Sequence, residues 1–448
     1  MSETIYALAT PPGKGGVAVI RVSGPAATAS LSALTPAAPL VPRQARFCKI
    51  IDPVSRETID RGLVLYFKGP ASFTGEDVVE YHVHGGGAVT RAVLEVLGRL
   101  DGFRLALPGE FTRRAFENGK MDLTEAEAVA DLIEAETALQ RTQAMNQLGG
   151  ALSALYHRWG DDLKKALAHL EADLEFPDED LPQGVAPEVF PVLETLLSEI
   201  KTHLDDNHRG ERLRDGIRIA VIGAPNAGKS SLVNALAQRD VAIVSAHAGT
   251  TRDVIDVHLD LGGYPVILSD TAGLRPAQLG AEPQDEIESE GIRRALVQAQ
   301  QADIRVLLFD AAALPMLDSD TLALKDDNAL IVFNKGDKLE ENPVDIPVHD
   351  ALLLSVKTGR GVPEFIAAVT ARIERLVGCR EMPSLTRQRH REALQDCRAA
   401  LERALGAALP ELITEDVRLA IRHLGRITGR VDVEDLLDVI FKDFCIGK

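Results

Sequence analysis

Cysteine is scarce in this sequence, and its few copies are scattered. The 448 residues include only Cys48, Cys379, Cys397 and Cys445. Their spacing fits neither a zinc site nor a Cys-x-x-Cys redox motif. We therefore expect no zinc site and no disulfide framework.

Long apolar runs and excess positive charge are also lacking. No hydrophobic stretch approaches the ~20 residues that a membrane-spanning helix needs, and residues 1–7 lack the basic and apolar character of an export signal. We expect a cytoplasmic protein without membrane contact. The formal net charge of −18 argues against a nonspecific coat on nucleic acid, which depends on lysine and arginine. Any contact with nucleic acid is therefore expected to be local.

The residue pattern predicts several domains. Residues 1–118 contain short β-rich runs separated by Gly and Pro turns, which indicates a small α+β domain. Helical patterning fills 119–213 and returns over 379–448, whereas strands alternate with helices over 214–378. We predict a multidomain α/β protein in which a doubly wound nucleotide-binding domain is inserted into a helical domain. The strands expected in the inserted domain are 217–222, 254–261, 266–269, 304–309, 330–333 and 352–355.

Helical spacing begins near Asp122. Val129, Leu132 and Ile133 recur at the interval of one helix face, and Thr124 is a residue type that can cap a helix. We expect helices from here to Phe176, with Thr124 at the first cap.

A phosphate-binding loop follows the strand at 217–222. Residues 223–230 read Gly-Ala-Pro-Asn-Ala-Gly-Lys-Ser and precede an apolar helical stretch. In this arrangement backbone amides surround the phosphates, Lys229 reaches the terminal ones and Ser230 coordinates magnesium. A chance glycine-rich turn would lack the strand and helix on either side. Gly13-Lys-Gly-Gly16 lacks the required hydroxyl and spacing, and it is interpreted as a turn.

Two further segments predict guanine-nucleotide chemistry. Asp270-Thr-Ala-Gly273 ends a strand, where Asp270 can support magnesium and the Gly273 amide can sense the γ-phosphate. Asn334-Lys-Gly-Asp337 also ends a strand, and Asp337 can accept from N1–H and the exocyclic amine of guanine, while Asn334 can bond the base edge.

The remaining features concern the base and the attacking water. Ser355-Val-Lys357 stands where GTPases usually carry Ser-Ala-Lys against the base. Leu274 occupies the place of the water-orienting glutamine of small GTPases, so another group must position the water. Asn226 and the oxygen-rich stretch 245–253 could hold a monovalent cation that replaces an arginine finger.

The whole chain resembles the tRNA modification GTPase MnmE (TrmE) family. The most specific similarity is at the C-terminal end, in residues 424–430, 434–438, 440–441 and Cys445-Ile-Gly-Lys448, which generic GTPases lack. The resemblance implies a potassium-dependent G domain that dimerises across its nucleotides. It also implies Glu288 as the catalytic glutamate, with Glu282, Glu286 and Glu290 as weaker candidates.

The resemblance implies these ligand sets. The metal ligands are Ser230 and Thr251 for magnesium, and Asn226, Ser245, His247 and Thr250 for potassium. The nucleotide-binding residues are Asn226, Ala227, Gly228, Lys229, Ser230, Ser231, Ser245, Thr250, Thr251, Asp270, Thr271, Ala272, Gly273, Asn334, Lys335, Asp337, Ser355, Val356 and Lys357.

A folate site is implied for the N-terminal domain. The resemblance assigns 5-formyltetrahydrofolate or a related folate to Arg21, Glu80, Lys120 and Lys448, with Arg21 on the folate glutamate and Glu80 on the pterin amine edge. Cys445 stays open between a weak catalytic thiol and a small buried hydrophobe.

Some charged residues allow two interpretations. His82 and His84 alternate on a strand, which suggests a metal pair, but no third ligand is visible, so packing or polar roles are favoured. Arg418, Arg422, Arg426 and Arg430 could form a stripe for tRNA phosphates, or they could pair with Glu415, Asp416 and Asp432.

The function implied is GTP-dependent tRNA modification by a homodimer. With an MnmG/GidA-like partner that carries the flavin, the complex would add an aminomethyl or carboxymethylaminomethyl group at C5 of the wobble uridine of certain tRNAs. Two alternatives share some of the motifs: a regulatory GTPase of ribosome assembly, and a folate-dependent one-carbon transferase.

Overall fold

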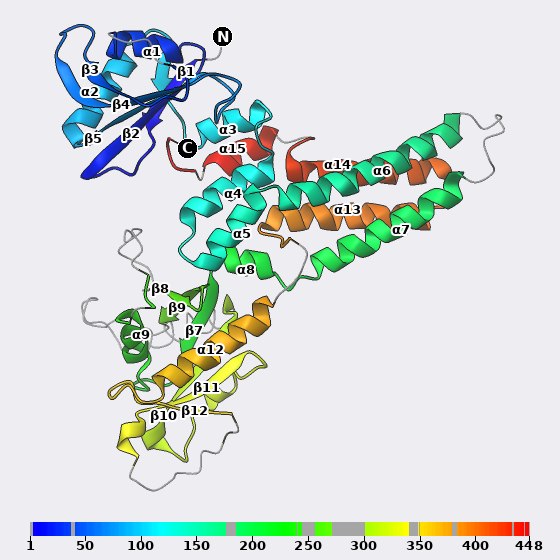
Figure 1. Cartoon of the computed structure of the whole chain (residues 1–448). Coiled ribbons are helices and arrows are strands. Elements are labelled where there is room, and N and C mark those ends of the chain that lie inside the picture. Colours follow the sequence, from blue (N-terminus) through cyan, green and yellow to red (C-terminus); the bar gives the residue numbers. More distant parts are fainter. Residues whose placement is uncertain are drawn as a thin grey trace, which may run out of the picture. The chain divides into compact units, whose positions relative to one another are not determined.

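The protein, seen in a computed structural model, divides into two compact units. The structure describes residues 3–36, 41–175, 185–239, 241–243, 256–270, 301–339, 348, 350–378, 383–431, 434–442 and 444–447. The first unit combines Met1–Ala130, Gln147–Gln183 and Ala407–Lys448, and the second combines Asp131–Asn146 and Gly184–Gly406 (Figure 1). Helices predicted for one helical domain are thus shared between the two units. None of the described helices combines the length and apolar character that crossing a bilayer requires.

A six-stranded sheet forms the N-terminal part of the first unit. Its order is β3-β4-β5-β2-β1-β6, with β1 and β6 parallel and the other neighbours antiparallel. Helices α1 and α2 cover one face, where inward-facing residues such as Ile20, Val64 and Tyr81 are fully buried. The bounds are β1 Thr4–Leu8, β2 Gly15–Ser23, α1 Ala27–Leu34, β3 Arg46–Ile51, β4 Thr58–Phe67, β5 Val78–Gly85, α2 Gly87–Gly98 and β6 Phe103–Leu105.

Among the residues that the structure describes, the opposite face of this sheet is covered only in part. Phe111 of α3 (Glu110–Glu117) packs on Ile5 and Ala7 of β1. Further along the face, Phe47 and Leu63 lie opposite each other on β3 and β4, and they are 67% and 42% exposed. Successive side chains of a strand point to opposite faces of the sheet. Phe47 and Leu63 therefore both lie on the face away from α1 and α2, where their apolar side chains are exposed.

Two long helices of the first unit lie side by side. In α6 (Ala151–Glu175) the buried residues Leu152, Tyr156, Trp159 and Leu163 alternate at intervals of four and three. That spacing gives one apolar stripe, which packs along α14 (Pro410–Thr428), with Leu424 next to Gly160 (Figure 1).

The first cap of the helical region differs from the prediction. Helix α4 (Leu123–Glu134) is capped by Asp122, whose Oδ1 accepts from the Glu125 amide at 3.0 Å and from the Thr124 hydroxyl at 2.7 Å. The Glu125 carboxylate in turn accepts from the Asp122 amide at 2.8 Å, which completes a capping box. The prediction that Thr124 caps the helix was therefore wrong. The Asp122 carboxylate, two residues earlier, accepts from both the Thr124 hydroxyl and the Glu125 amide.

The C-terminal tail docks on the N-terminal domain. Phe441 of α15 (Glu434–Lys442) and Phe444 pack against Leu123 and Ala126. Ile446 then forms an antiparallel bridge with Pro108. A Cβ on Gly447, whose φ is +98°, would lie 2.3 Å from the carbonyl oxygen of Leu8. Only glycine permits this approach.

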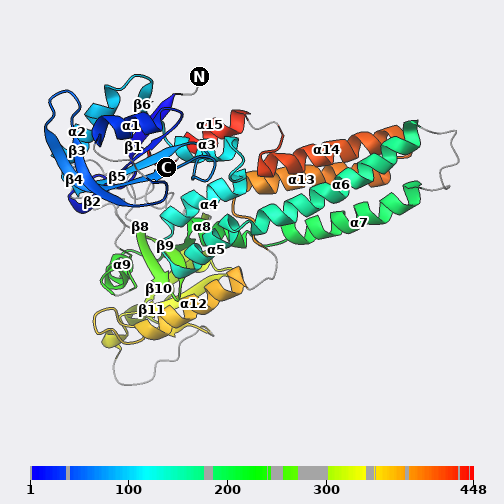
Figure 2. The same ribbon diagram turned by 45° about the horizontal axis from the view of Figure 1, so that its top comes forward.

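The second unit contains the predicted doubly wound sheet. Its order is β12-β11-β10-β7-β9-β8, parallel except for β8, and buried clusters line both faces. Helix α12 (Val362–Val377) packs Phe365 and Val369 on one face (Figure 2). The predicted strands are confirmed, with ends that differ by at most two residues. Their bounds are β7 Ile217–Ile222, β8 Asp256–Leu261, β9 Tyr264–Asp270, β10 Ile304–Asp310, β11 Ala329–Asn334 and β12 Leu352–Leu353.

The other helices of this unit lie before, within and after the inserted sheet in the sequence. Helices α7 and α13 pack on each other. The bounds are α5 Ala138–Leu148, α7 Val185–Leu204, α8 Arg209–Asp215, α9 Lys229–Ala237, α11 Ser319–Leu322 and α13 Gln388–Gly406.

Candidate functional site

The candidate site lies at the carboxyl end of β7. From β7 the chain passes to β8 and β9 on one side, and then crosses to β10, β11 and β12 on the other. Such a reversal leaves a crevice beyond the strand ends, where open α/β sheets bind ligands. Residues 223–230 follow β7 directly, so the predicted phosphate loop occupies this position.

Close backbone contacts determine the shape of this loop. A Cβ on Gly223 would lie 2.2 Å from the carbonyl oxygen of Leu308 in β10. Gly228 has φ +101° and Asn226 has φ 64°, in the left-handed region that glycine and asparagine tolerate best. The loop therefore turns back over the sheet before α9 begins.

The start of α9 presents positive charge to the loop. Lys229 is its first residue, and the ammonium nitrogen donates to the carbonyl oxygens of Gly223 at 2.8 Å and Ala224 at 3.1 Å. Ser230 and Ser231 are exposed on the first turn. Backbone amides at a helix N-terminus and a nearby ammonium form an arrangement that suits phosphate.

Asn334 joins the phosphate loop to the predicted base loop. Its side-chain nitrogen donates to the carbonyl oxygen of Ala227 at 3.0 Å, and its oxygen accepts from the Val356 amide at 3.2 Å. The residue is 3% exposed, and a Cβ on Gly228 would lie 2.2 Å from its amide nitrogen. One amide hydrogen and one oxygen lone pair remain for the base-edge contact, which stays a prediction.

The predicted guanine-reading carboxylate is held by the base loop. Ser355, 2% exposed, donates from its hydroxyl to Asp337 Oδ1 at 2.7 Å. This hydrogen bond lowers the pKa of Asp337, so the exposed carboxylate is ionised at neutral pH. Lys357, two residues after Ser355, is exposed. The backbone amide of Val356 donates to the side-chain oxygen of Asn334 at 3.2 Å.

Sequence reasoning missed an ion pair that supports this loop. Lys335 donates to Asp310 Oδ2 at 2.7 Å, and Asp310 is the last residue of β10. Burial raises the pKa of Asp310, but the hydrogen bonds from Lys335 and from the Ala312 amide outweigh it and leave the pKa lowered. No motif contains both partners, because they come from neighbouring strands.

Several predicted residues lie outside the described part of the chain. The backbone of Asp270 ends β9, opposite Val221 of β7, so this strand end reaches the phosphate loop; its side chain is not described. The others that fall outside the described residues are Ser245, His247, Thr250, Thr251, Thr271, Ala272, Gly273, Leu274, Glu282, Glu286, Glu288, Glu290, Asp432 and Lys448.

The structure brings two of the predicted folate residues into one ion pair. Arg21 Nε donates to Glu80 Oε1 at 3.0 Å across the β2–β5 pair. The Arg21 guanidinium lies 5.5 Å from the ring centre of Phe73 and 5.7 Å from that of Phe111. Lys120 donates to the carbonyl oxygen of Pro70 at 3.0 Å, in the same β4–β5 connection as Phe73.

The two histidines on β5 have separate carboxylate partners. His82 contacts Glu80 at 3.3 Å and His84 contacts Asp60 at 2.9 Å. Within the described residues no three His, Cys, Asp or Glu side chains gather to hold a metal. Polar roles therefore account for both. Cys445 is exposed, so the buried alternative for this thiol is wrong.

The first arginine of the predicted stripe, Arg418 on α14, is engaged in ion pairs. Arg418 contacts Glu171 at 2.8 Å and also pairs with Glu415. Arg422 and Arg426 also have interaction partners in the protein. The described part of the chain thus favours the paired, solvated face over a free phosphate-binding stripe at Arg418.

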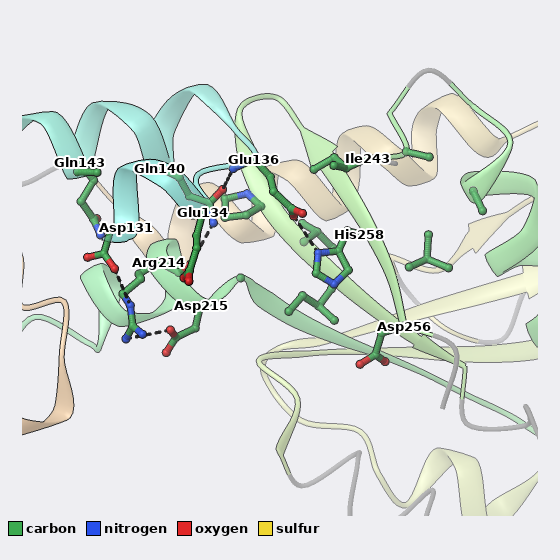
Figure 3. A pocket seen from close by; sticks show the side chains of 18 residues that line it. Asp131, Glu134, Glu136, Gln140, Gln143, Arg214, Asp215, Ile243, Asp256 and His258 are labelled. Carbon is green, nitrogen blue, oxygen red and sulfur yellow. Dashed lines mark hydrogen bonds and ion pairs between the residues drawn. The ribbon is translucent and has the colours of Figure 1, made fainter. Parts of the chain in front are cut away.

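A cavity of about 710 Å³ lies beside the β8–β9 hairpin (Figure 3). Across it, His258 of β8 contacts Glu136 at 2.9 Å, from the corner before α5. The Leu139 amide donates to the carbonyl oxygen of Gly263 at the hairpin tip at 3.4 Å. These contacts connect the corner before α5 to the β8–β9 hairpin, and β9 ends at Asp270, next to the phosphate loop. No sequence motif predicted them.

Comparisons with known proteins point to one family. Residues 4–120 match the family model of the GTP-binding protein TrmE N-terminus, and residues 123–445 match that of the MnmE helical domain. The tRNA modification GTPase MnmE of Parvibaculum lavamentivorans is 54% identical over all of both chains. The chain belongs to the tRNA modification GTPase MnmE family. The member from Paramagnetospirillum magneticum is 53% identical, again over all of both chains.

Solved structures add a distant similarity. The G domain of the T. maritima FeoB iron transporter is 23% identical, and the match covers 36% of this chain and 99% of that domain with a TM-score of 0.25. The MnmE-family assignment therefore depends on sequence relatives and on the family models.

We predict that Asp337→Asn converts this MnmE-family chain from guanine to xanthine recognition. Two charge-assisted hydrogen bonds are worth about 1.5–3 kcal/mol each, so GDP affinity should fall by at least about 100-fold while XDP affinity rises. Calorimetric titration with both nucleotides measures this. Asp327→Asn, which changes an exposed carboxylate of the same domain, is the control, and equal GDP binding by both variants would contradict the assignment.

Proposed function

We propose that the chain binds and hydrolyses GTP at the phosphate loop, and that this hydrolysis drives tRNA modification. The observation that carries the proposal is the Asn334 side chain, which fastens the phosphate loop to the loop of Ser355 and Asp337. This arrangement supports a single site in which the start of α9 binds phosphate and the Asp337 carboxylate reads guanine. Membership of the MnmE family supports the tRNA substrate.

The chain's own residues suit the phosphate end. The ammonium of Lys229, which caps loop carbonyl oxygens, is positioned to move to the β- and γ-phosphates. Ser230 offers an exposed hydroxyl on the first turn of α9. Hydroxyl and phosphate oxygens are the hard ligands that magnesium prefers. We assign magnesium to Ser230 and Thr251, with Asp270 and Gly273 on the γ-phosphate side.

A potassium site would complete the charge around the phosphates. Asn226 is exposed in the loop and offers an amide oxygen, and we assign potassium to Asn226, Ser245, His247 and Thr250. Bound there, the cation would supply the positive charge that an arginine finger supplies elsewhere. Because Leu274 cannot orient a water molecule, we assign that role to Glu288.

The N-terminal domain would supply the one-carbon chemistry. We propose that it binds 5-formyltetrahydrofolate through Arg21, Glu80, Lys120 and Lys448. An MnmG/GidA-like partner would carry the flavin, and the complex would add an aminomethyl or carboxymethylaminomethyl group at C5 of the wobble uridine. The exposed thiol of Cys445 is a weaker catalytic candidate.

Exposed apolar side chains on β3 and β4 of the N-terminal sheet support a homodimer. Phe47 is 67% exposed and Leu63 42% exposed at directly paired positions. Adjacent apolar side chains of this size on a sheet face favour burial against another surface, and we propose a second copy of the chain. We place the assembly in the cytoplasm, where tRNA and GTP are available.

We predict that potassium stimulates GTP hydrolysis relative to sodium at equal ionic strength. Removing one developing-charge contact typically costs about 100-fold in rate or more, so Asn226→Ala should abolish the stimulation. Phosphate release by the purified protein measures it. Asn234→Ala, at an exposed position of α9, is the matched control. Equal hydrolysis rates in potassium and in sodium would contradict the potassium assignment.

We also predict that a deletion strain loses the modification at C5 of the wobble uridine. Mass spectrometry of total tRNA nucleosides measures it. The wild-type gene should restore the modified nucleoside, whereas Lys229→Ala should not, because hydrolysis needs the phosphate-binding ammonium. Lys165→Ala, at an exposed position of α6, should restore it fully. Intact modification in the deletion strain would favour a ribosome-assembly GTPase instead.

A further inference from the structure

We propose that the corner between α4 and α5 positions the β8–β9 hairpin for GTP hydrolysis. Glu136 of this corner contacts His258 of β8 at 2.9 Å. The Leu139 amide donates to the carbonyl oxygen of Gly263, at the hairpin tip, at 3.4 Å. The inference rests on the proposed GTPase function and adds two positioning residues, Glu136 and His258, to that site. Neither belongs to a predicted nucleotide-binding motif.

His258 connects the corner to both ends of one stretch of the G domain. Its carbonyl oxygen accepts from the Ile243 amide at 2.9 Å. Residues 244–255 follow Ile243 in the sequence and precede Asp256, the first residue of β8. The cation ligands that we assign outside the phosphate loop fall within this stretch, namely Ser245, His247, Thr250 and Thr251. One strand thus holds the points where the stretch begins and ends.

The second strand of the hairpin leads to the γ-phosphate side. β9 runs parallel to β7, and its last residue, Asp270, lies opposite Val221 near the end of β7. The phosphate loop follows β7 directly. A shift of the hairpin relative to β7 would therefore move the end of β9 relative to the phosphate loop. A misplacement of about 1 Å at a reacting centre can cost about 100-fold in rate.

The corner is itself held in place by Gln140. The side-chain oxygen of Gln140 accepts from the amides of Glu136 and Thr137 at 2.9 and 3.0 Å. Its side-chain nitrogen donates to the carbonyl oxygen of Arg214 at 3.0 Å. Arg214 lies at the end of α8, which precedes β7. One side chain therefore links the backbone of Glu136 to the helix that leads into the strand of the phosphate loop.

A buried carboxylate near the end of α4 fixes the corner further. Asp131 Oδ1 accepts from Arg214 Nε at 3.1 Å and from Arg387 Nη2 at 2.5 Å, and its side chain is 8% exposed. Arg214 precedes the inserted sheet in the sequence and Arg387 follows it. Hydrogen bonds between ionised groups are stronger than neutral ones. The corner is therefore fixed to both points at which the chain enters and leaves the inserted domain.

The cavity beside the hairpin leaves few contacts to hold it on this side. Its volume is about 710 Å³, with α5 on one side and β8 and β9 on the other (Figure 3). Elements of a protein are normally held in place by close packing, but among the described residues this space is open. The position of the hairpin here depends on the Glu136–His258 pair and on the contact of Leu139 with Gly263.

GTP hydrolysis and calorimetric titration with GDP, both on the full-length protein, test the proposal. Glu136→Gln and His258→Gln should each lower kcat by about two- to fivefold, the range that exposed ion pairs contribute. The double variant should lose no more than either single variant, because the two residues act as a pair. GDP affinity should stay at the wild-type value, since neither residue belongs to the phosphate loop or to the base loop.

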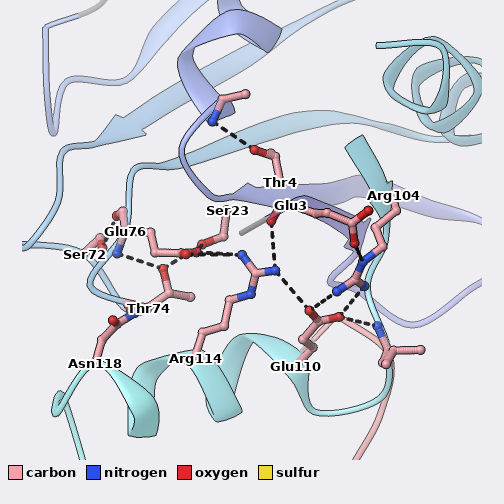
Figure 4. A network of polar contacts seen from close by, with 12 residues as sticks. Glu3, Thr4, Ser23, Ser72, Thr74, Glu76, Arg104, Glu110, Arg114 and Asn118 are labelled. Atoms are coloured by element: carbon pink, nitrogen blue, oxygen red, sulfur yellow. Dashed lines mark hydrogen bonds and ion pairs between the residues drawn. The ribbon is translucent and has the colours of Figure 1, made fainter. Parts of the chain in front are cut away.

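Two ion pairs elsewhere supply matched controls. Glu402 of α13 contacts Lys201 of α7 at 2.9 Å in the same unit. Glu3 contacts Arg104 at 2.5 Å in the N-terminal domain, where Glu110 is a second partner of the same guanidinium (Figure 4). Glu402→Gln and Glu3→Gln each remove a carboxylate from a partly exposed pair. Both should leave kcat and GDP affinity unchanged.

The contrary results are distinct. Wild-type kcat in both single variants would overturn the positioning role and keep the GTPase function. Parallel losses of kcat and of GDP affinity would indicate general structural damage and would overturn it too. So would losses that multiply in the double variant, because the two residues would then act separately. A wild-type protein that binds GDP but does not hydrolyse GTP would overturn the proposed function itself.

Discussion

The nucleotide site depends on one buried amide. Asn334 donates to Ala227 in the phosphate loop and accepts from Val356 in the base loop, at 3.0 and 3.2 Å. Because Asn334 is 3% exposed, losing it would leave both backbone groups without a partner, and each unsatisfied buried group costs about 1–3 kcal/mol. The phosphate loop and the base loop therefore cannot shift independently of each other. Gly228 belongs to the same constraint, since a Cβ there would lie 2.2 Å from the Asn334 nitrogen.

A second constraint operates in the N-terminal domain. The tail returns across the domain, with Ile446 bridged to Pro108 and Gly447 against the Leu8 carbonyl. This contact connects the last residues of the chain to the end of β1, whose neighbour β2 carries Arg21. The C-terminal signature is therefore part of the N-terminal domain's structure, which explains why a GTPase domain alone would not need it.

Local patterns predicted much of the fold. The strand at 217–222 and the loop after it were recoverable because alternation, glycine spacing and the following helix all lie within a short window. Ends of elements were less secure, since Asp122 rather than Thr124 caps α4. Ion pairs between distant parts of the chain could not be predicted from the sequence. Asp310 and Lys335, like His258 and Glu136, come from separate elements and share no motif. The resemblance selected Arg21 and Glu80, but only the sheet register shows that they form one pair.

The most direct test of the shared constraint is the binding of pyrophosphate, which has no base, to Asn334→Ala. If Asn334 shapes the phosphate loop, calorimetry will show weaker pyrophosphate binding by this variant, whereas Asp337→Asn, which changes only the base contact, will bind pyrophosphate like the wild type. Circular dichroism establishes that both variants are folded. Pyrophosphate binding by Asn334→Ala at wild-type affinity would contradict the account and leave Asn334 with a role at the base alone.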